Sequence, residues 1–300
     1  MSETTSIKVI CYGEVLWDHL PSGRIVGGAP LNVAVHATQL GLPAGIISRI
    51  GEDEAGQALL AFLAGKGLPT DWMQRDPAWP TGAVHVRLDE EGSPRYEIVE
   101  PSAWDHLVAD ADAALAVRQV GVLVYGSLAC RREQSLTALL TLLPLADRRV
   151  FDVNLRPPFY SRELLDTLLS LATLVKMNGE ELDIIAGWHG LTGTASEKMA
   201  YLCDRYSLSG MLLTQGAEGA SYLDASGLYR HPGIPVRVSD TIGSGDAFLA
   251  AFLSRHLKGS PPTESLRFAC ATGALVASRP GGTPDISDQA VQALLAGGGL

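Results

Sequence analysis

The sequence predicts an α/β protein with a mostly parallel sheet that helices cover on both sides. Short apolar runs alternate with longer segments of helical periodicity along most of the 300 residues. The short runs are apolar throughout, as strands are when both faces of a parallel sheet are buried. Two further pairs of strands have no helix between them, which predicts a small separate sheet. We therefore expect a three-layer α/β/α fold with a small β-sheet standing off its main body.

The elements of the main body follow one another in a regular order. The expected strands are Lys8–Tyr12, Ala44–Ile50, Val120–Tyr125, Arg149–Val153, Leu174–Met177 and Gly210–Thr214. The expected helices include Leu31–Leu40, Glu54–Ala64, Arg132–Leu143 and Arg162–Leu171. After residue 243 the pattern is largely helical, with segments at Asp246–Lys258, Thr263–Ser278 and Ser287–Leu295.

Two ribbons break this rhythm. Val84–Leu88 alternates in polarity and is followed by a polar turn and a second run at Tyr96–Val99. Val15–Leu20 and Arg24–Val26 flank another turn near the N-terminus. We expect these ribbons, about residues 14–27 and 82–101, to form a lid on one domain that spans residues 1–300. The lid sheet is also a candidate surface for a homodimer.

The composition excludes some classes of function. The net charge of −10 argues against a nucleic-acid-binding surface, which would be basic. The N-terminus lacks a secretion-signal pattern, and no run approaches the roughly 20 apolar residues of a membrane helix. The four cysteines lack metal-ligand spacing and read as thiols of a reducing compartment. We expect a protein of the cytoplasm that has no membrane partner.

The most informative run is residues 240–248, Asp-Thr-Ile-Gly-Ser-Gly-Asp-Ala-Phe, which is followed at once by an apolar helix. Gly243, Ser244 and Gly245 place backbone N–H groups where a helix begins, and such groups bind anions such as phosphate. A carboxylate beside a bound phosphate would repel it. We therefore interpret Asp246 as the base that takes a proton from a hydroxyl attacking that phosphate.

A second glycine turn lies near the N-terminus. Gly27 and Gly28 precede a helix that carries Asn32, and the first strand is followed by Asp18. A carboxylate, an amide and accessible backbone N–H groups are suited to hold the hydroxyls of a sugar. The sequence therefore predicts a sugar site at Asp18, Gly28 and Asn32.

The run Asp152-Val153-Asn154-Leu155-Arg156 ends a predicted strand. Alternation along a strand would put Asp152, Asn154 and Arg156 on one side. A guanidinium can bind phosphate oxygens with two hydrogen bonds, so Arg156 is a candidate clamp for a transferring phosphoryl group.

Residues 240–248 resemble the C-terminal signature of the ribokinase-like sugar kinases, also called the phosphofructokinase B family. The usual form has Thr or Gly-Ala where this chain has Ile242 and Gly243-Ser244. The early Gly-Gly turn with Asn32, and the Asp-x-Asn-x-Arg run, are also similar to elements of this family. The matching elements occur in family order from Gly13 to Gly281, so the resemblance covers most of the chain.

The resemblance implies roles for further residues. Asn178 and Glu181 match an Asn-x-x-Glu element that acts near Mg²⁺ and the nucleotide phosphates. Residues 214–219 resemble a Thr-x-Gly-x-x-Gly nucleotide loop with a role for Thr214, Gly216 and Gly219. The resemblance also implies a candidate site for a monovalent cation, K⁺, formed by Asp240, Ile242, Arg279 and Gly281.

Ala29-Pro30 and the run 101–105 resemble the fructokinase branch, and Trp104 in that run is a candidate platform for the apolar face of a sugar. The implied activity is ATP-dependent phosphorylation of a primary hydroxyl, with fructose giving fructose 6-phosphate. Ribose, 2-keto-3-deoxygluconate and a nucleoside remain alternative substrates. A non-catalytic sugar-binding regulator and a dinucleotide-binding oxidoreductase are the remote alternatives, and the second lacks its Gly-x-Gly-x-x-Gly motif after the first strand.

Overall fold

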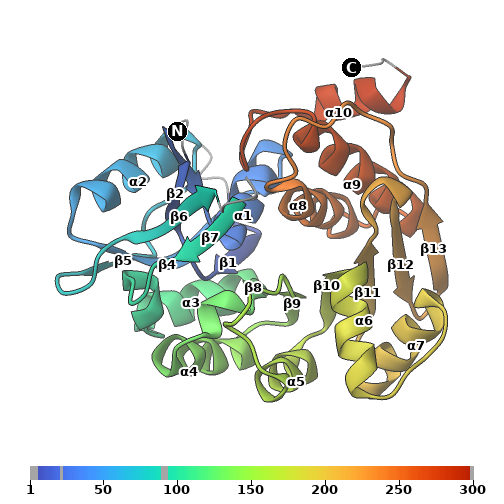
Figure 1. The fold of residues 1–300 in the computed structure, drawn as a ribbon, viewed down its shortest axis with the longest axis horizontal. Coiled ribbons are helices and arrows are strands. Elements are labelled where there is room, and N and C mark those ends of the chain that lie inside the picture. Colours follow the sequence, from blue (N-terminus) through green and yellow to red (C-terminus); the bar gives the residue numbers. More distant parts are fainter. Residues whose placement is uncertain (1–5, 21–22, 89–93, 298–300) are drawn as a thin grey trace.

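The computed structural model describes residues 6–20, 23–88 and 94–297. In this part of the chain a nine-stranded sheet forms the centre, in the order β13-β12-β11-β10-β9-β8-β1-β4-β5 (Figure 1). The strands β11, β10, β9, β8, β1, β4 and β5 are parallel to one another. Strand β12 is antiparallel to both of its neighbours, β11 and β13. Their bounds are β1 Val9–Tyr12, β4 Ala44–Gly51, β5 Met73–Asp76, β8 Val122–Gly126, β9 Arg148–Asp152, β10 Leu174–Asn178, β11 Gly210–Thr214, β12 Ala220–Asp224 and β13 Gly227–His231.

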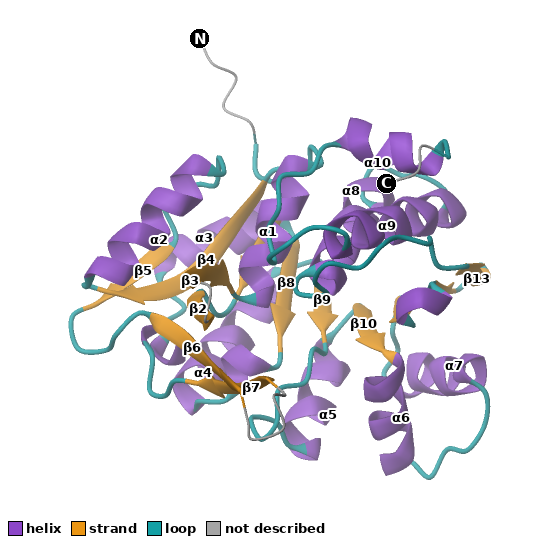
Figure 2. Ribbon diagram, turned by 45° about the horizontal axis from the view of Figure 1, so that its top comes forward, coloured by secondary structure: helices purple, strands orange, loops and turns teal. Residues whose placement is uncertain are grey.

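Helices cover both faces of this sheet (Figures 1 and 2). One face packs against α1 Ala29–Gln39, α2 Glu54–Gly65, α8 Ser244–His256, α9 Pro262–Ala277 and α10 Asp288–Leu295. The other face packs against α3 Ala111–Val120, α4 Glu133–Leu142, α5 Arg162–Leu171, α6 Gly179–Trp188 and α7 Ala195–Arg205.

Strand β1 shows why the central strands are apolar at every position. Val9 and Cys11 belong to the core on the α1 side, whereas Ile10 and Tyr12 belong to the core on the α3 side. All four side chains have no exposed surface. Successive side chains of a strand point to opposite faces, so a strand buried on both faces favours apolar residues at every position.

A second, four-stranded sheet has the order β3-β2-β6-β7 in the described residues. Strands β2 and β6 are parallel, and each has an antiparallel hairpin partner. The bounds are β2 Leu16–Leu20, β3 Gly23–Gly27, β6 Gly82–Leu88 and β7 Pro94–Ile98. The two predicted ribbons therefore join in one sheet, while the polar turn at residues 89–93 and residues 21–22 lie outside the described chain.

The predicted main-body elements are confirmed, with small shifts at their ends. Val120 ends α3 instead of starting β8, because Gly121 in the left-handed conformation (φ 73°) separates the two. The strands β5, β12 and β13 and the helices α3, α6 and α7 have no counterpart among the predicted ranges. All four cysteines are free thiols, and none of the described helices is long and apolar enough to span a membrane.

Candidate active site

The N-terminus of α8 forms the base of the candidate site. Gly243 is its N-cap with φ 74°, and Asp246 lies in the first turn with 8% of its surface exposed. The Ser244 amide donates a 3.3 Å hydrogen bond to the Thr241 carbonyl. In the described structure the amides of Gly245 and Asp246 have no protein acceptor, so two donors of this turn remain for an anion.

The two glycine turns meet at a single hydrogen bond. Asn32 Nδ2 donates to Asp246 Oδ2 at 2.8 Å, although the residues lie 214 positions apart in the chain. Asn32 is 4% exposed, and its Oδ1 is buried with no hydrogen-bond partner in the described structure. The early and late glycine turns therefore face each other, and the Asn32 Oδ1 acceptor remains for an incoming donor.

Asp18 and Gly28 belong to the N-terminal segment that contributes Asn32 to the site. Asp18 is on β2, and burial raises its pKa to about 6 although Arg156 opposes the rise. Gly28 caps α1 with φ 113°, and a Cβ there would lie 2.4 Å from the Glu14 carbonyl oxygen. A side chain is therefore excluded at position 28 by both conformation and space.

Arg156 is exposed, and its Nη1 donates to the Leu155 carbonyl at 3.1 Å. Its positive charge opposes the rise that burial causes in the pKa of the Glu14, Asp18 and Asp246 carboxyls. The predicted alternation with Asp152 is wrong, because β9 ends at Asp152 and Asn154 takes a left-handed conformation with φ 38°. Arg156 is therefore positioned by a loop and not by the strand.

Sequence reasoning missed a buried ion pair beneath this turn. Lys176 on β10 donates to both carboxylate oxygens of Asp152 on β9, at 3.0 and 3.1 Å. A Cβ on Gly245 would lie 3.0 Å from Lys176 Nζ, so the ammonium lies directly under the α8 turn. Burial acts to lower the pKa of Lys176, but the charges of Asp152, Asp246 and Glu181 outweigh it and raise the pKa above its ordinary value.

Lys176 affects the pKa of Asp246 in turn. Burial raises the pKa of Asp246, while Lys176, the hydrogen bond from Asn32 and Arg156 oppose the rise. A pKa moved toward neutrality suits a carboxylate that accepts a proton during a reaction. The signal for this pair was present in the sequence, since Asp152 follows the apolar pair Val150-Phe151 and Lys176 stands between Val175 and Met177.

Asn178 and Glu181 begin helix α6 with a reciprocal capping box. Glu181 Oε2 accepts from the Asn178 amide at 2.8 Å, and its Oε1 accepts from the Leu155 amide at 2.9 Å. This carboxylate therefore ties the loop after β9 to the end of β10. In the part of the chain that the structure describes, no group of three or more His, Cys, Asp or Glu side chains is placed to hold a metal ion.

The turn after β11 has the geometry of a glycine loop. Thr214 ends the strand, and Gly216 and Gly219 have φ values of 57° and 96°. The Gln215 amide donates to the Gly219 carbonyl at 2.8 Å and closes the turn. The loop lies at the same end of the sheet as the other elements, because β11 is parallel to β10 and in register with it.

Three of the predicted cation residues, Asp240, Ile242 and Gly281, come together beside the start of α8. Asp240 accepts from the Ile242 amide at 3.0 Å and from the Gly281 amide at 3.1 Å. Arg279 donates a hydrogen bond to the Asp285 carbonyl within the same loop. The carboxylate therefore joins the segment before α8 to the loop after α9.

The prediction that Trp104 offers a face to a sugar is wrong. The side chain has no exposed surface, and the Arg131 guanidinium lies over its ring at 4.0 Å. Arg131 also forms a buried ion pair with Asp105 at 2.7 Å. The run 101–105 is a packing element under the small sheet.

One glycine of the site offers a sharp test. A Cβ on Gly243 would lie 2.3 Å from the backbone oxygen of Gly282, in addition to the strain of its positive φ. Gly259 has a similar φ of 82° with open space around it. Backbone strain should lower the free energy of unfolding by about 1–2 kcal/mol in both Gly→Ala variants. The contact with Gly282 should add a further loss in Gly243→Ala. Equal losses in urea denaturation would contradict the close contact between the turn and Gly282.

A second prediction concerns Glu14, which is buried near Asp246 with Oε2 unpartnered in the described structure. Burial raises its pKa to about 7. A carboxyl with a raised pKa stabilises the folded state at low pH, and this contribution is lost between its unfolded pKa near 4.5 and its folded pKa. The free energy of unfolding of Glu14→Gln, relative to that of the wild type, should therefore rise by on the order of 3 kcal/mol between pH 4 and pH 8.

Glu180→Gln is the matched control for Glu14→Gln, because Glu180 is exposed at the start of α6. Its free energy of unfolding should follow the pH dependence of the wild type. If Glu14→Gln follows the wild type as well, the Glu14 carboxyl does not carry the raised pKa.

Comparison with known proteins agrees with this geometry. A model of the pfkB family carbohydrate kinases matches residues 22–289. Fructokinase-1 of Zea mays is 29% identical over 311 residues, which cover 94% of this chain and 95% of that protein. A fructokinase of Klebsiella pneumoniae is 32% identical over 260 residues, which cover 82% of this chain and 83% of that protein. The crystal structure of a fructokinase with bound ATP from Xylella fastidiosa is similar with a TM-score of 0.84 at 25% identity, covering 96% of this chain and 98% of that chain.

Proposed function

Because the chain belongs to the pfkB family of carbohydrate kinases, whose members transfer a phosphoryl group to a sugar hydroxyl, we propose that it phosphorylates fructose with ATP to give fructose 6-phosphate. The choice of fructose rests on the relatives that carry this activity in their names. The observation that carries the proposal is the buried Asp246 carboxylate, held by Asn32 beside free amides at the start of α8.

In the proposed reaction Asp18, Gly28 and Asn32 hold the sugar. Asp246 accepts the proton of the primary hydroxyl as its oxygen forms a bond to the γ-phosphorus, and the bond from phosphorus to the leaving oxygen of ADP breaks. The free amides of the α8 turn, Lys176 beneath it and the exposed guanidinium of Arg156 stabilise the charge on the transferring group. Phosphoryl transfer depends on such positioning and electrostatics more than on covalent help from the protein.

We further propose that the nucleotide lies against Thr214, Gly216 and Gly219 with its phosphates directed to the α8 turn. Mg²⁺ would be held by phosphate oxygens and water, near Asn178 and Glu181, and would neutralise charge on the phosphates. Both Glu181 oxygens already accept backbone hydrogen bonds, which favours contact through water.

The same proposal assigns K⁺ to the loop around Asp240, with backbone oxygens of Ile242, Arg279 and Gly281 as its partners. The carboxylate and the converging loops fit a cation that takes oxygen ligands. A cation there would fix the start of α8 through Asp240.

We propose that the small sheet closes over the sugar, since water competes with the sugar hydroxyl for the phosphoryl group. Its strand β2 carries Asp18, which gives it direct contact with the bound sugar. The outer face of the small sheet is the proposed dimer surface. Sedimentation velocity tests this by measuring whether the protein in solution has the mass of a dimer. We keep the cytoplasm as the proposed compartment, and fluorescence microscopy of the tagged protein would test it.

A panel of sugars with coupled detection of ADP tests the substrate. With Mg²⁺ and ATP present, kcat/KM for fructose should exceed that for ribose, 2-keto-3-deoxygluconate and a nucleoside by at least about tenfold. A larger kcat/KM for one of the other three would replace fructose and keep the kinase. No sugar-dependent ADP with any acceptor would leave only a sugar-binding role.

A further inference from the structure

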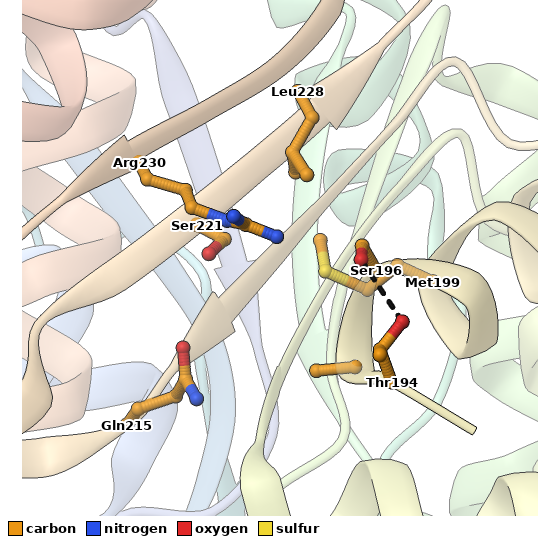
Figure 3. Close-up of a pocket in the computed structure, with 8 residues that line it drawn as sticks. Thr194, Ser196, Met199, Gln215, Ser221, Leu228 and Arg230 are labelled. Atoms are coloured by element: carbon orange, nitrogen blue, oxygen red, sulfur yellow. Dashed lines mark hydrogen bonds between the residues drawn. The ribbon is translucent and has the colours of Figure 1, made fainter. Parts of the chain in front are cut away.

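A cavity of about 250 Å³ lies between the start of α7 and the strands β12 and β13 (Figure 3). Arg230, Ser221 and Gln215 border it on the strand side, and Thr194, Ser196 and Met199 border it on the helix side. It is on the opposite face of the sheet from α8. Tyr222, the neighbour of Ser221 in β12, packs against Phe252 of α8, and successive residues of a strand point to opposite faces.

Two side chains of the cavity wall have unused hydrogen-bonding capacity. Ser221 is 6% exposed, and its hydroxyl makes no hydrogen bond to any residue that the structure describes. Arg230 forms no ion pair with a described carboxylate, and its guanidinium extends toward the cavity in Figure 3. Ser221 is buried, but its hydroxyl opens onto the cavity, where a ligand or water can satisfy it.

The helix side adds further donors. Thr194 caps α7, and its capping box satisfies the Thr194 and Glu197 amides. The amides of Ala195 and Ser196 have no acceptor in the described chain and lie at the positive end of the helix dipole. Glu197 is the nearest acid of this helix, and its Oε2 already accepts hydrogen bonds from the amide and hydroxyl of Thr194.

We propose that this cavity binds a small phosphate monoester. Arg230 offers a fork of donors for phosphate oxygens, and the Ser221 and Ser196 hydroxyls and Gln215 surround the same space. No carboxylate borders the cavity among the described residues, whereas Met199 and Leu228 offer an apolar surface for the carbon skeleton. The volume falls just below the roughly 300 Å³ at which sites for drug-sized ligands begin, which suits an ester of sugar size.

The site is coupled to the nucleotide loop by Gln215. This residue belongs to the turn between Thr214 and Gly219, and its side chain borders the cavity. A ligand that contacts both Gln215 and the start of α7 fixes one side of that turn. Binding of the ester is therefore expected to change the KM for ATP and leave the KM for the sugar unchanged. This effect on KM, unlike binding itself, rests on the proposed function.

Isothermal titration calorimetry tests binding without turnover. Inorganic phosphate and fructose 6-phosphate are titrated separately into protein saturated with a non-hydrolysable ATP analogue, so that the phosphate-binding turn of α8 is occupied. The variants are Arg230→Ala and Ser221→Ala. Arg118→Ala is the control, because it removes one exposed arginine from α3 that makes no hydrogen bond or ion pair with a described residue.

We expect one site for fructose 6-phosphate, weakened at least about tenfold in Arg230→Ala and unchanged in Arg118→Ala. Ser221→Ala should weaken it about threefold or more, since one hydrogen bond is lost. Inorganic phosphate should bind at the same site, and tighter binding of the sugar ester would show that the sugar contributes. No binding to the analogue complex, or equal affinity in Arg230→Ala and the wild type, would overturn the site. Binding with an unchanged KM for ATP would overturn the coupling.

Discussion

Asp246→Asn is expected to lower kcat by about a thousandfold, because an amide cannot accept the proton of the attacking hydroxyl. The variant should fold normally. The amide oxygen of Asn has nearly the same position and shape as Asp246 Oδ2, so it can still accept the 2.8 Å hydrogen bond from Asn32. Loss of a buried carboxyl whose pKa is raised by burial carries no stability cost at neutral pH.

The measurement is kcat from sugar-dependent ADP release, together with the sugar dissociation constant from calorimetry. Glu133→Gln is the matched control, since Glu133 is the first-turn acid of α4 on the other face of the sheet. Its kcat should equal that of the wild type, and both variants should bind the sugar. A kcat within a factor of about three of the wild type in Asp246→Asn would remove this residue from the role of base.

Lys176→Met is expected to lower the free energy of unfolding by about 3–5 kcal/mol, because it leaves Asp152 buried without its partner. Lys176 and Asp152 are 6% and 4% exposed and form two hydrogen bonds to each other. Adding Asp152→Asn to Lys176→Met removes the unpaired charge, so the double variant should recover most of the loss. It should still have a lowered kcat, since the ammonium under the α8 turn is absent.

The control is Lys198→Met, which breaks the ion pair with Asp183 on the surface at 2.6 Å. Asp183 is 69% exposed, so this variant should lose less than about 1 kcal/mol. Urea denaturation at pH 7 gives all of these values. Equal losses for the two lysine variants would show that the buried pair carries no special stability, and no recovery in the double variant would show that the loss arises from packing.

The strands and helices of the main body were predictable because the polarity of their side chains follows the burial of each position. Both faces of the strand Val9–Tyr12 are buried, so all four of its residues are apolar. The antiparallel pair β12 and β13 escaped prediction since β13 is half-exposed and mixed in polarity. The run after Asp152 was misread because alternation was extended past the end of β9, to Asn154 with its left-handed conformation.

The site was predictable where the backbone determines it. The turns at Gly28 and Gly243 require glycine for space and conformation, and this requirement is visible in a single sequence. The partnership of Lys176 with Asp152 depends on the order of strands in the sheet, which no local pattern contains. Trp104 was misassigned because an aromatic residue that packs in the core and one that faces a ligand look the same in sequence.

The proposed role of Asp246 requires that the sugar hydroxyl and the γ-phosphate meet at its carboxylate. A crystal structure with fructose and a non-hydrolysable ATP analogue tests this requirement directly. We expect the 6-hydroxyl within about 3 Å of an Asp246 oxygen, with the γ-phosphate at the free amides of Gly245 and Asp246. A sugar bound without contact to Asp246 and Asn32, or phosphates bound away from the start of α8, would contradict it.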